Sequence, residues 1–566
     1  MKYRNYSADC YDDLRQMLRT SAETFGEKTL FLQKTDGEYR SVSFKKFYAD
    51  VCGLGTALLD MGLSEKKIVL MGANCYAWAV AYMAVVCGVG TIVPLDEELN
   101  TKEVAEIVGL CEVDAVICAD SLLDKFSSLG ERVKKIPFSN IPKWISFGSK
   151  LVRTGDRGYF SAKIESREPC VILFSRGNSE DLRGVMLSHR NLCFNIFEIA
   201  QMVYLDDKDV FLSTLPLHDA YECTCGFLCP MSRGCSIAFS DGLQFLGREM
   251  KEISPTVMIT VPSMLDRMYE RLWHHLETHH AADQVRRMVA VTNSLPNQKA
   301  GLTAKKKAFS PIHNSFGGKL RLMISAGSLA TTDTVKGFRD LGIPVLQGYE
   351  ITECSPVITL NRDTYFRDDS VGLCTPNALL DIAEMQEDGV GEIRYRGDGV
   401  MVGYYKMPEQ THEVIRDGWF YTGDMGYLDG DGFLHVIGQK KNAIDLGKGQ
   451  KIFPEELETL LCHSFYIKEC IVVGYPDEKN ELPHIVALIY PDINAIEETY
   501  GSDVSAAQIE NALERVLAEV NGAFPSYKRI ETFLIQDGEF PKTSMKKIRR
   551  TGLAERNFAT FRNRKR

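Results

Sequence analysis

Residues 172–191 read ILFSRGNSEDLRGVMLSHRN and place a polar loop directly after a buried apolar segment. The left part is typical of the end of a strand, and the right part is typical of the start of a helix. Between them lie small, polar and basic residues. A strand, a polar loop and a helix in this order can cradle phosphate groups. The stretch therefore predicts a phosphate-binding loop, although its two acids, Glu180 and Asp181, are unusual in one.

Strand and helix signals alternate on both sides of this loop, from about residue 10 to about residue 380. This alternation predicts an α/β fold with a largely parallel sheet. In such sheets ligands collect at the carboxyl ends of the strands, so a site is expected where small-residue turns follow. Strands of this kind are predicted in KIVLMGAN (67–74), TVMITVPSM (256–264), LRLMISAG (320–327) and IPVLQGYE (343–350).

One uncharged run, from Tyr76 to Leu95, has about the length of a membrane-spanning helix. Gly88 and Gly90 interrupt it, and TIVPL after them is rich in β-branched residues before a proline. We therefore expect a buried helix, a glycine turn and a buried strand here, rather than a membrane span.

A chain of 566 residues is longer than one hydrophobic core usually serves, so two or more domains are expected. From about residue 390 the pattern changes to alternating strands with Gly and Asp turns, and a compact α/β segment follows. We place the domain boundary between Lys440 and Lys441, which gives domains of residues 1–440 and 441–566.

The overall composition excludes several classes of protein. A formal net charge of −10 argues against a general nucleic-acid-binding protein. The first residues, MKYRNYSADCYDDLRQ, carry acids where a secretion signal needs an apolar core. The 16 cysteines are scattered, which is typical of reduced thiols in a cytoplasmic protein.

Two clusters of metal-ligating side chains have ordinary structural explanations. Cys223, Cys225, Cys229 and Cys235 lie in an apolar run with no paired histidines nearby, so we interpret them as small buried residues on a helix. His275 and His279 have helical i, i+4 spacing, but the segment is not H-E-x-x-H and no third ligand is marked. An exposed polar helix face is the favoured interpretation.

Four widely separated stretches occur in one order. They are LFSRGNSEDLRGVMLSHRN (173–191), GYEITECSP (348–356), GWFYTGDMGYLDGDGFLHVIG (418–438) and PKTSMKKIRR (541–550). The chain resembles the adenylate-forming superfamily over nearly its whole length, and segments 74–96 and 213–234 are most similar to bacterial long-chain fatty acyl-CoA synthetases. The resemblance implies a large N-terminal α/β domain and a small, mobile C-terminal α+β domain.

The resemblance also implies two reactions at one site. A carboxylate attacks the α-phosphate of ATP and gives acyl-AMP and pyrophosphate, and a thiol, usually that of CoA, then attacks the acyl carbonyl. The implied partners are ATP, Mg²⁺, CoA and a medium- or long-chain fatty acid or another carboxylate. Contact with a membrane is expected to be peripheral at most.

The residues at the family's functional positions can be named in this chain. Lys547 matches the lysine that bridges the carboxylate and the α-phosphate, and Thr352 matches a hydroxyl at the α-phosphate. Glu353 matches the Mg²⁺ carboxylate, Asp424 the ribose-binding aspartate, and Tyr349 the ring that stacks on adenine. A cation at Lys547 would offset the repulsion between two anions.

Further positions are implied less directly. The hinge between the two domains maps to Lys441, and His218 lies in the segment that usually faces the acyl chain, although a core histidine is an equal alternative. Further nucleotide contacts are implied at Ser175, Arg176, Gly177, Asn178, Ser179, Arg183, Gly184, Gly327, Gly348 and Gln439.

Several positions depart from the family pattern. Glu180 replaces a glycine of the phosphate loop, which adds a repelling charge and resists close approach of the backbone to a triphosphate. Glu350 also replaces a glycine, Gln439 replaces an arginine, and Asp219 replaces a histidine of the bacterial relatives.

Three hypotheses therefore stay open. The first is an ATP-dependent acyl-CoA synthetase. The second is a catalytically impaired protein that binds nucleotide or acyl-adenylate, and the third is a ligase that loads an acyl-carrier protein in trans. The retention of Lys547, Asp424, Thr352 and Glu353 favours catalysis, because an inactive descendant would lose the lysine as readily as the loop.

Overall fold

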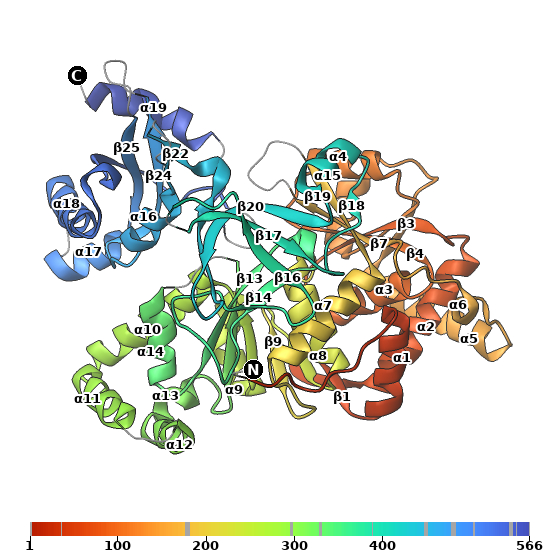
Figure 1. Ribbon diagram of the computed structural model, residues 1–566. Coiled ribbons are helices and arrows are strands. Elements are labelled where there is room, and N and C mark those ends of the chain that lie inside the picture. The colour runs from red at the N-terminus through yellow and green to blue at the C-terminus, as the bar shows by residue number, and fades with distance from the viewer. Residues whose placement is uncertain are drawn as a thin grey trace.

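The structure is a computed structural model that describes residues 3–35, 37–175, 182–294, 298–327, 331–387, 389–446, 451–476, 483–501, 504–542, 547–550 and 552–564. Most of the chain forms a layered α/β body, and a smaller C-terminal unit stands beside it (Figure 1).

The first large sheet is parallel through its centre and turns antiparallel at both ends. Its central strands β11 and β12 are short and buried along their whole length, as expected for strands covered on both faces. In order across the sheet they are β15 (Leu373–Cys374), β14 (Val357–Leu360), β13 (Val345–Glu350), β12 (Leu322–Ser325), β11 (Val257–Thr260), β9 (Val210–Ser213), β10 (Ser236–Phe239), β1 (Thr29–Thr35) and β2 (Glu38–Ser43).

The second sheet contains the opening stretch of the sequence analysis. Its strands are, in order, β18 (Gly403–Tyr404), β8 (Arg183–Ser188), β7 (Pro169–Ser175), β4 (Gly90–Leu95), β3 (Lys66–Met71), β5 (Ala115–Cys118) and β6 (Lys134–Pro137). The apolar run is confirmed as a buried helix and a buried strand, α3 (Tyr76–Val86) and β4. Within the described part of the chain, no helix is both long enough and apolar enough to cross a membrane.

The prediction that a helix follows the polar loop directly was wrong. Residues 183–188 form strand β8, which pairs antiparallel with β7, and α7 (His189–Met202) begins only after it. The physical reason is the period of two in RGVMLS, in which Val185 and Leu187 point into the core. Ser188 then starts the helix through a capping box with Asn191.

Helices cover both sheets and fill the space between them (Figure 1). One shared apolar core joins the two sheets to the central helices, a second core lies on the outer face of the first sheet, and a third lies outside the second sheet. The central helices are α1 (Leu14–Phe25), α2 (Phe44–Asp60), α3, α7 and α8 (Cys229–Ser232). The helices outside the first sheet are α9 (Leu246–Ile253), α10 (Pro262–Thr278), α11 (Ala282–Asn293), α12 (Gln298–Ala308), α13 (Ser310–Ser315) and α14 (Thr332–Asp340), and α4 (Thr101–Cys111) lies outside the second. Against α2 pack α5 (Ile141–Arg153) and α6 (Gly158–Ser161).

A third, antiparallel sheet leads from the body to the C-terminal unit. It consists of β16 (Leu379–Ala383), β17 (Gly391–Arg396), β20 (Trp419–Leu428), β19 (Ile415–Arg416) and β21 (Leu434–Gln439), with α15 (Pro408–Val414) inserted before β19.

The C-terminal unit, called the lid below, begins after β21 and has apolar cores of its own. Two antiparallel strands and one parallel strand form its sheet, and helices pack against it. Its elements are β22 (Ile444–Asp445), β23 (Lys451–Ile452), α16 (Pro454–Leu461), β24 (Ile467–Tyr475), β25 (His484–Pro491), α17 (Ile493–Tyr500), α18 (Ala506–Gly522), β26 (Thr532–Ile535) and α19 (Leu553–Arg564). The exact boundary between residues 440 and 441 stays a prediction.

Candidate active site

Asp424 lies at the centre of the candidate site and holds two predicted nucleotide-binding residues. The Tyr349 hydroxyl donates a hydrogen bond to Asp424 Oδ2 at 2.6 Å, and Gln439 Nε2 donates to Asp424 Oδ1 at 3.0 Å. Three elements supply these side chains: Tyr349 lies near the end of β13, and the antiparallel register of β20 and β21 sets Asp424 opposite Gln439. The structure thus brings together three residues that the sequence separates by up to 90 positions.

The Asp424 carboxyl is buried and therefore needs hydrogen-bond donors. Burial raises the pKa of this carboxyl, while the hydrogen bonds from Tyr349 and Gln439 act in the opposite direction. A buried carboxylate needs hydrogen-bond donors, and each of its oxygens can accept more than one. Hydroxyl groups of a bound sugar are donors of this kind, so the position suits a ribose.

Lys547 reaches this site from the lid. Its Nζ lies 3.5 Å from Oε1 of Glu350, which directly follows Tyr349, and its side chain remains half exposed (49%). Desolvation disfavours its charge, but the carboxylates of Glu350, Asp219 and Asp424 outweigh this effect and raise the pKa of Lys547. The ammonium group is therefore firmly charged and surrounded by anions.

Gly327 leaves room for the lysine. A Cβ atom added at Gly327 would lie 3.3 Å from Lys547 Cε and 3.7 Å from Glu350 Oε1, and the glycine has φ +108°, which side chains rarely adopt. A side chain here would strain the backbone and crowd the lysine. Gly327 thus lies directly against the side chain of Lys547.

Asp219 is a member of the site that the sequence marked only as a departure from the family. Burial, together with the charge of Glu350, raises the pKa of Asp219 to about 7. Its Oδ1 accepts a hydrogen bond from the backbone N–H of Tyr221 at 2.8 Å. Asp219 and Glu350 therefore add two acids around Lys547, and their joint effect could not be anticipated from the sequence without the fold.

A second cluster surrounds Glu353, the predicted Mg²⁺ ligand. Its Oε1 accepts a hydrogen bond from the Tyr404 hydroxyl at 2.8 Å, and the Arg183 guanidinium lies 5.4 Å from the centre of the Tyr404 ring. Burial raises the pKa of Glu353. Thr352 opens the same short 3₁₀ turn, Thr352–Cys354. No sequence signal marked Tyr404.

The phosphate loop can be followed only at its ends. Ser175 ends β7 opposite Arg183 of β8, and Gly184 follows in the same ladder. A Cβ atom at Gly184 would lie 2.9 Å from the Phe174 ring, so this glycine is needed for packing. The predicted contacts Arg176, Gly177, Asn178 and Ser179, with Glu180 and Asp181, lie outside the described residues.

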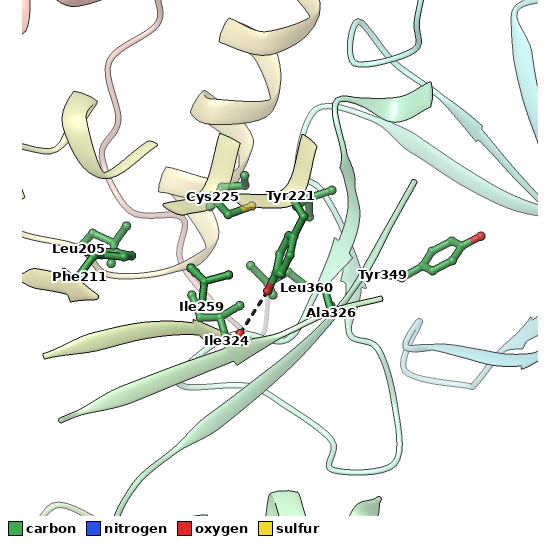
Figure 2. Close-up of a pocket in the computed structure, with 12 residues that line it drawn as sticks. Leu205, Phe211, Tyr221, Cys225, Ile259, Ile324, Ala326, Tyr349 and Leu360 are labelled. Carbon is green, nitrogen blue, oxygen red and sulfur yellow. Dashed lines mark hydrogen bonds between the residues drawn. The ribbon is translucent and has the colours of Figure 1, made fainter. Parts of the chain in front are cut away.

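An apolar cavity lies behind the site, between β11, β12, β13 and the helical segment at 222–228 (Figure 2). Its volume of about 10 Å³ is room for about one water molecule. The Tyr221 hydroxyl donates to the Ile324 carbonyl at 3.1 Å, while Tyr349 points away from the cavity (Figure 2). The lining is Ile199, Leu205, Phe211, Tyr221, Cys225, Ile259, Ile324, Ala326, Gly348, Tyr349, Val357 and Leu360.

His218 does not line the cavity, although Tyr221, three residues further along the chain, does. Its Nε2 lies 3.7 Å from Asp96 Oδ2, and burial lowers its pKa. The role of His218 in an acyl pocket therefore stays a prediction.

The cysteine and histidine clusters have the structural roles expected of them. Cys223, Cys225 and Cys229 are buried in the helical segment 222–232, and Cys235 is buried just before β10 rather than on a helix. His275 near the end of α10 and His279 directly after it are both exposed. Over the described ranges, no group of three or more His, Cys, Asp and Glu side chains is arranged to hold a metal ion.

Comparisons with known proteins agree with these observations. Residues 18–405 match the AMP-binding enzyme family, and residues 441–560 match the AMP-binding enzyme C-terminal domain. Long-chain-fatty-acid–CoA ligase 5 of Mus musculus is 28% identical over 509 residues, which are 82% of this chain and 73% of that protein. Long chain acyl-CoA synthetase 1 of Arabidopsis thaliana is 28% identical over 482 residues, 77% of this chain and 72% of that one.

Solved structures show the same fold at lower identity. ATP-bound MatB from Rhodopseudomonas palustris superposes with a TM-score of 0.75 at 20% identity, covering 97% of this chain and 100% of that one. The anthranilate CoA ligase AuaEII with anthranoyl-AMP gives a TM-score of 0.75 at 18% identity and covers 98% of both chains. The predicted fold class is confirmed. The chain belongs to the AMP-binding enzyme family.

Proposed function

We propose that this protein is an ATP-dependent ligase that joins a medium- or long-chain fatty acid to CoA through an acyl-adenylate. The observation that carries the proposal is the position of Lys547: the lid delivers its charged Nζ to Glu350, next to Tyr349 and the buried Asp424. A charged ammonium group beside the proposed nucleotide contacts suits the joining of two anions.

Each residue has a task in the first reaction. Tyr349 offers its ring to adenine, and Asp424, oriented by Gln439, accepts from the ribose. Lys547 then lies between the α-phosphate and the incoming carboxylate, where it neutralises the repulsion between them and stabilises the charge that develops on the phosphate oxygens. Thr352 would add a hydroxyl donor to the same phosphate.

Glu353 fits a Mg²⁺ ion that arrives with ATP. Mg²⁺ in nucleotide sites is usually held by one or two carboxylates and by phosphate oxygens, and burial of Glu353 disfavours its charge unless a cation is near. Arg183 lies on the strand that leaves the phosphate loop and would contact the phosphates in bidentate fashion. The ion would supply further neutralisation of the phosphate charge.

The apolar cavity is proposed to receive the acyl chain. It adjoins Tyr349 and Gly348 of the nucleotide site, and its lining offers no charged side chain. Because its present volume is about that of one water molecule, entry of a chain requires lining side chains to move, and Tyr221 bridges the space to Ile324. The length of the acyl chain that the cavity accepts would depend on how far the Tyr221 side chain can move.

The hinge is proposed at Lys441 because Lys440 is tied to the body, whereas the shorter hydrogen bond of Asn442 goes to the lid. Lys440 Nζ lies 2.7 Å from Glu392 of β17 and 3.0 Å from Glu384, which follows β16. Asn442 Nδ2 donates to Glu455 of lid helix α16 at 2.6 Å and, over a longer 3.4 Å, to Gln439 at the end of the body. A change of backbone angles at Lys441 would therefore rotate the lid against the body.

Lys441→Pro should spare acyl-AMP formation and stop thioester formation. Proline fixes φ, so the lid would stay near its present orientation, in which Lys547 faces the nucleotide site. Single-turnover assays of each half-reaction, with Lys441→Ala as the control for loss of the side chain, measure this. A normal rate of thioester formation in the proline variant would refute the hinge at this residue.

Binding of the substrate carboxylate should depend on pH through the ionisation of Asp219. Its pKa of about 7 means that Asp219 is neutral below pH 7 and becomes an anion above it, next to Glu350 and Lys547. The added charge would repel the incoming carboxylate, so KM for the acid should rise about fivefold to tenfold between pH 6 and pH 8. Asp219→Asn should flatten this profile, whereas an unchanged slope in the variant would exclude Asp219 as its source.

One observation favours a second candidate, a binding protein with little catalytic activity. Glu350 stands where the family has a glycine, and its carboxylate already pairs with Lys547, so a substrate acid must compete with it.

The two candidate functions differ in whether the protein turns over ATP and a fatty acid to acyl-CoA. Incubation with ATP, CoA, Mg²⁺ and saturated fatty acids of increasing length, followed by mass spectrometry, should give acyl-CoA if the proposal holds. Bound nucleotide without any thioester would favour the second candidate.

A further inference from the structure

Two cysteine thiols face each other in the lid, between the end of α16 and β24. Cys462 follows the last residue of α16 and is exposed, whereas Cys470 lies in β24 and is 3% exposed. Their Sγ atoms are 3.4 Å apart. The pair thus combines a sulfur that solvent reaches with a buried sulfur in contact with it.

The buried member of this pair is packed against the support of the lysine segment. Cys470 Sγ lies 3.6 Å from the carbonyl oxygen of Glu458. The Glu458 carboxylate accepts a hydrogen bond from the Val472 N–H at 2.6 Å and forms a close ion pair with Arg550. Arg550 follows Lys547 by three residues, so the dithiol, the glutamate and the lysine segment form one contact chain.

Arg550 ties this segment to the rest of the lid. Its guanidinium pairs with Glu458, lies 3.9 Å from Glu455 and donates to the Val472 carbonyl at 3.4 Å. A shift of α16 relative to β24 therefore moves the groups that hold Arg550 and, through it, Lys547.

We propose that Cys462 and Cys470 form a redox-sensitive dithiol whose oxidation to a disulfide slows the adenylation reaction. The effect on adenylation rests on the proposed function, whereas formation of the disulfide does not. Bond formation would shorten the Sγ–Sγ distance from 3.4 Å to about 2.05 Å and pull the end of α16 toward β24.

The chemistry needs a two-electron oxidant, such as a hydroperoxide. The exposed Cys462 thiolate attacks the peroxide oxygen and becomes a sulfenic acid, and the peroxide is reduced to an alcohol or water. Cys470 then attacks the sulfenic sulfur, and its proton leaves with the hydroxide as water. The hydrogen bond with Cys462, burial and the charge of Glu458 raise the pKa of the Cys470 thiol, whereas Arg550 opposes that shift. The exposed sulfur therefore reacts first.

The test treats the full-length protein with hydrogen peroxide and reads two quantities. Peptide mass spectrometry should find a linked 462–470 pair, lighter by two hydrogens, about 2 Da, and dithiothreitol should reverse it. Acyl-AMP formation should fall roughly 10- to 100-fold on oxidation and recover on reduction, because small displacements of a catalytic group have effects of this size. Cys462→Ser should retain its rate after peroxide.

Cys10→Ser is the matched control, since Cys10 is also exposed but lies in the N-terminal body. This variant should lose activity on oxidation as the unaltered protein does. Absence of the linked peptide under conditions that oxidise Cys10 would overturn the dithiol. A disulfide that forms without slowing acyl-AMP formation would overturn its regulatory effect. If the reduced protein makes no acyl-AMP at all, the proposed function fails instead, and the peptide result still decides on the dithiol.

Discussion

Lys547→Ala should lower the rate of acyl-AMP formation by about 100- to 1,000-fold, the usual effect of removing one group that stabilises transition-state charge. The raised pKa of Lys547 keeps it charged, and three carboxylates act on it. Its loss leaves Glu350 and the incoming acid facing each other without a cation. Thioester formation from supplied acyl-AMP should survive, because that step does not join the carboxylate to the phosphate.

Rapid-quench measurement of each half-reaction checks this expectation. Lys542→Ala is the matched control: it removes a lysine five residues away that pairs with Glu469 and Glu539 inside the lid. That variant should retain adenylation. Equal loss of both half-reactions in Lys547→Ala would contradict the assigned role and point to a general disturbance of the lid.

Asp424→Ala should weaken ATP binding on the order of 100-fold. The carboxylate is proposed to accept two ribose hydroxyls, and hydrogen bonds to a charged group contribute about 1.5–3 kcal/mol each; two bonds at the lower end of this range correspond to a factor of about 100. The change would also leave the Tyr349 hydroxyl and the Gln439 amide without their present acceptor. Isothermal titration calorimetry with ATP and Mg²⁺ measures the loss.

Asp381→Ala serves as the control, because Asp381 pairs with Arg394 at the surface of the same sheet. The affinity of the Asp381→Ala variant for ATP should stay within about twofold of that of the unaltered protein. Unchanged ATP affinity in Asp424→Ala would show that the nucleotide binds elsewhere.

Single helices could be predicted because apolar spacing and start signals lie within a short stretch of sequence. The helix α4 and the helix α16 have the apolar spacing, the start signals and the lengths that define them in the sequence. Strand β8 was mistaken for the start of a helix because it is only six residues long and runs directly into α7, although the spacing of Val185 and Leu187 is that of a strand, as its pairing with β7 shows.

The candidate site was predictable as a set of residues but not as a geometry. Motif order identified Tyr349, Asp424, Gln439 and Lys547, and the structure brings them together. The contact between Glu350 and Lys547 depends on how the lid docks, which no spacing in the sequence encodes. The same holds for the facing thiols of Cys462 and Cys470, which depend on a helix packing on a strand.

The proposed first reaction joins a fatty acid to the α-phosphate of ATP in this site and releases pyrophosphate. Pyrophosphate release from ATP, measured with Mg²⁺ and a panel of carboxylates in the absence of CoA, tests it most directly. We expect pyrophosphate release that requires a medium- or long-chain fatty acid, stops after about one turnover without CoA, and continues when CoA is added. No acid-dependent pyrophosphate release from a folded protein that binds ATP would contradict it.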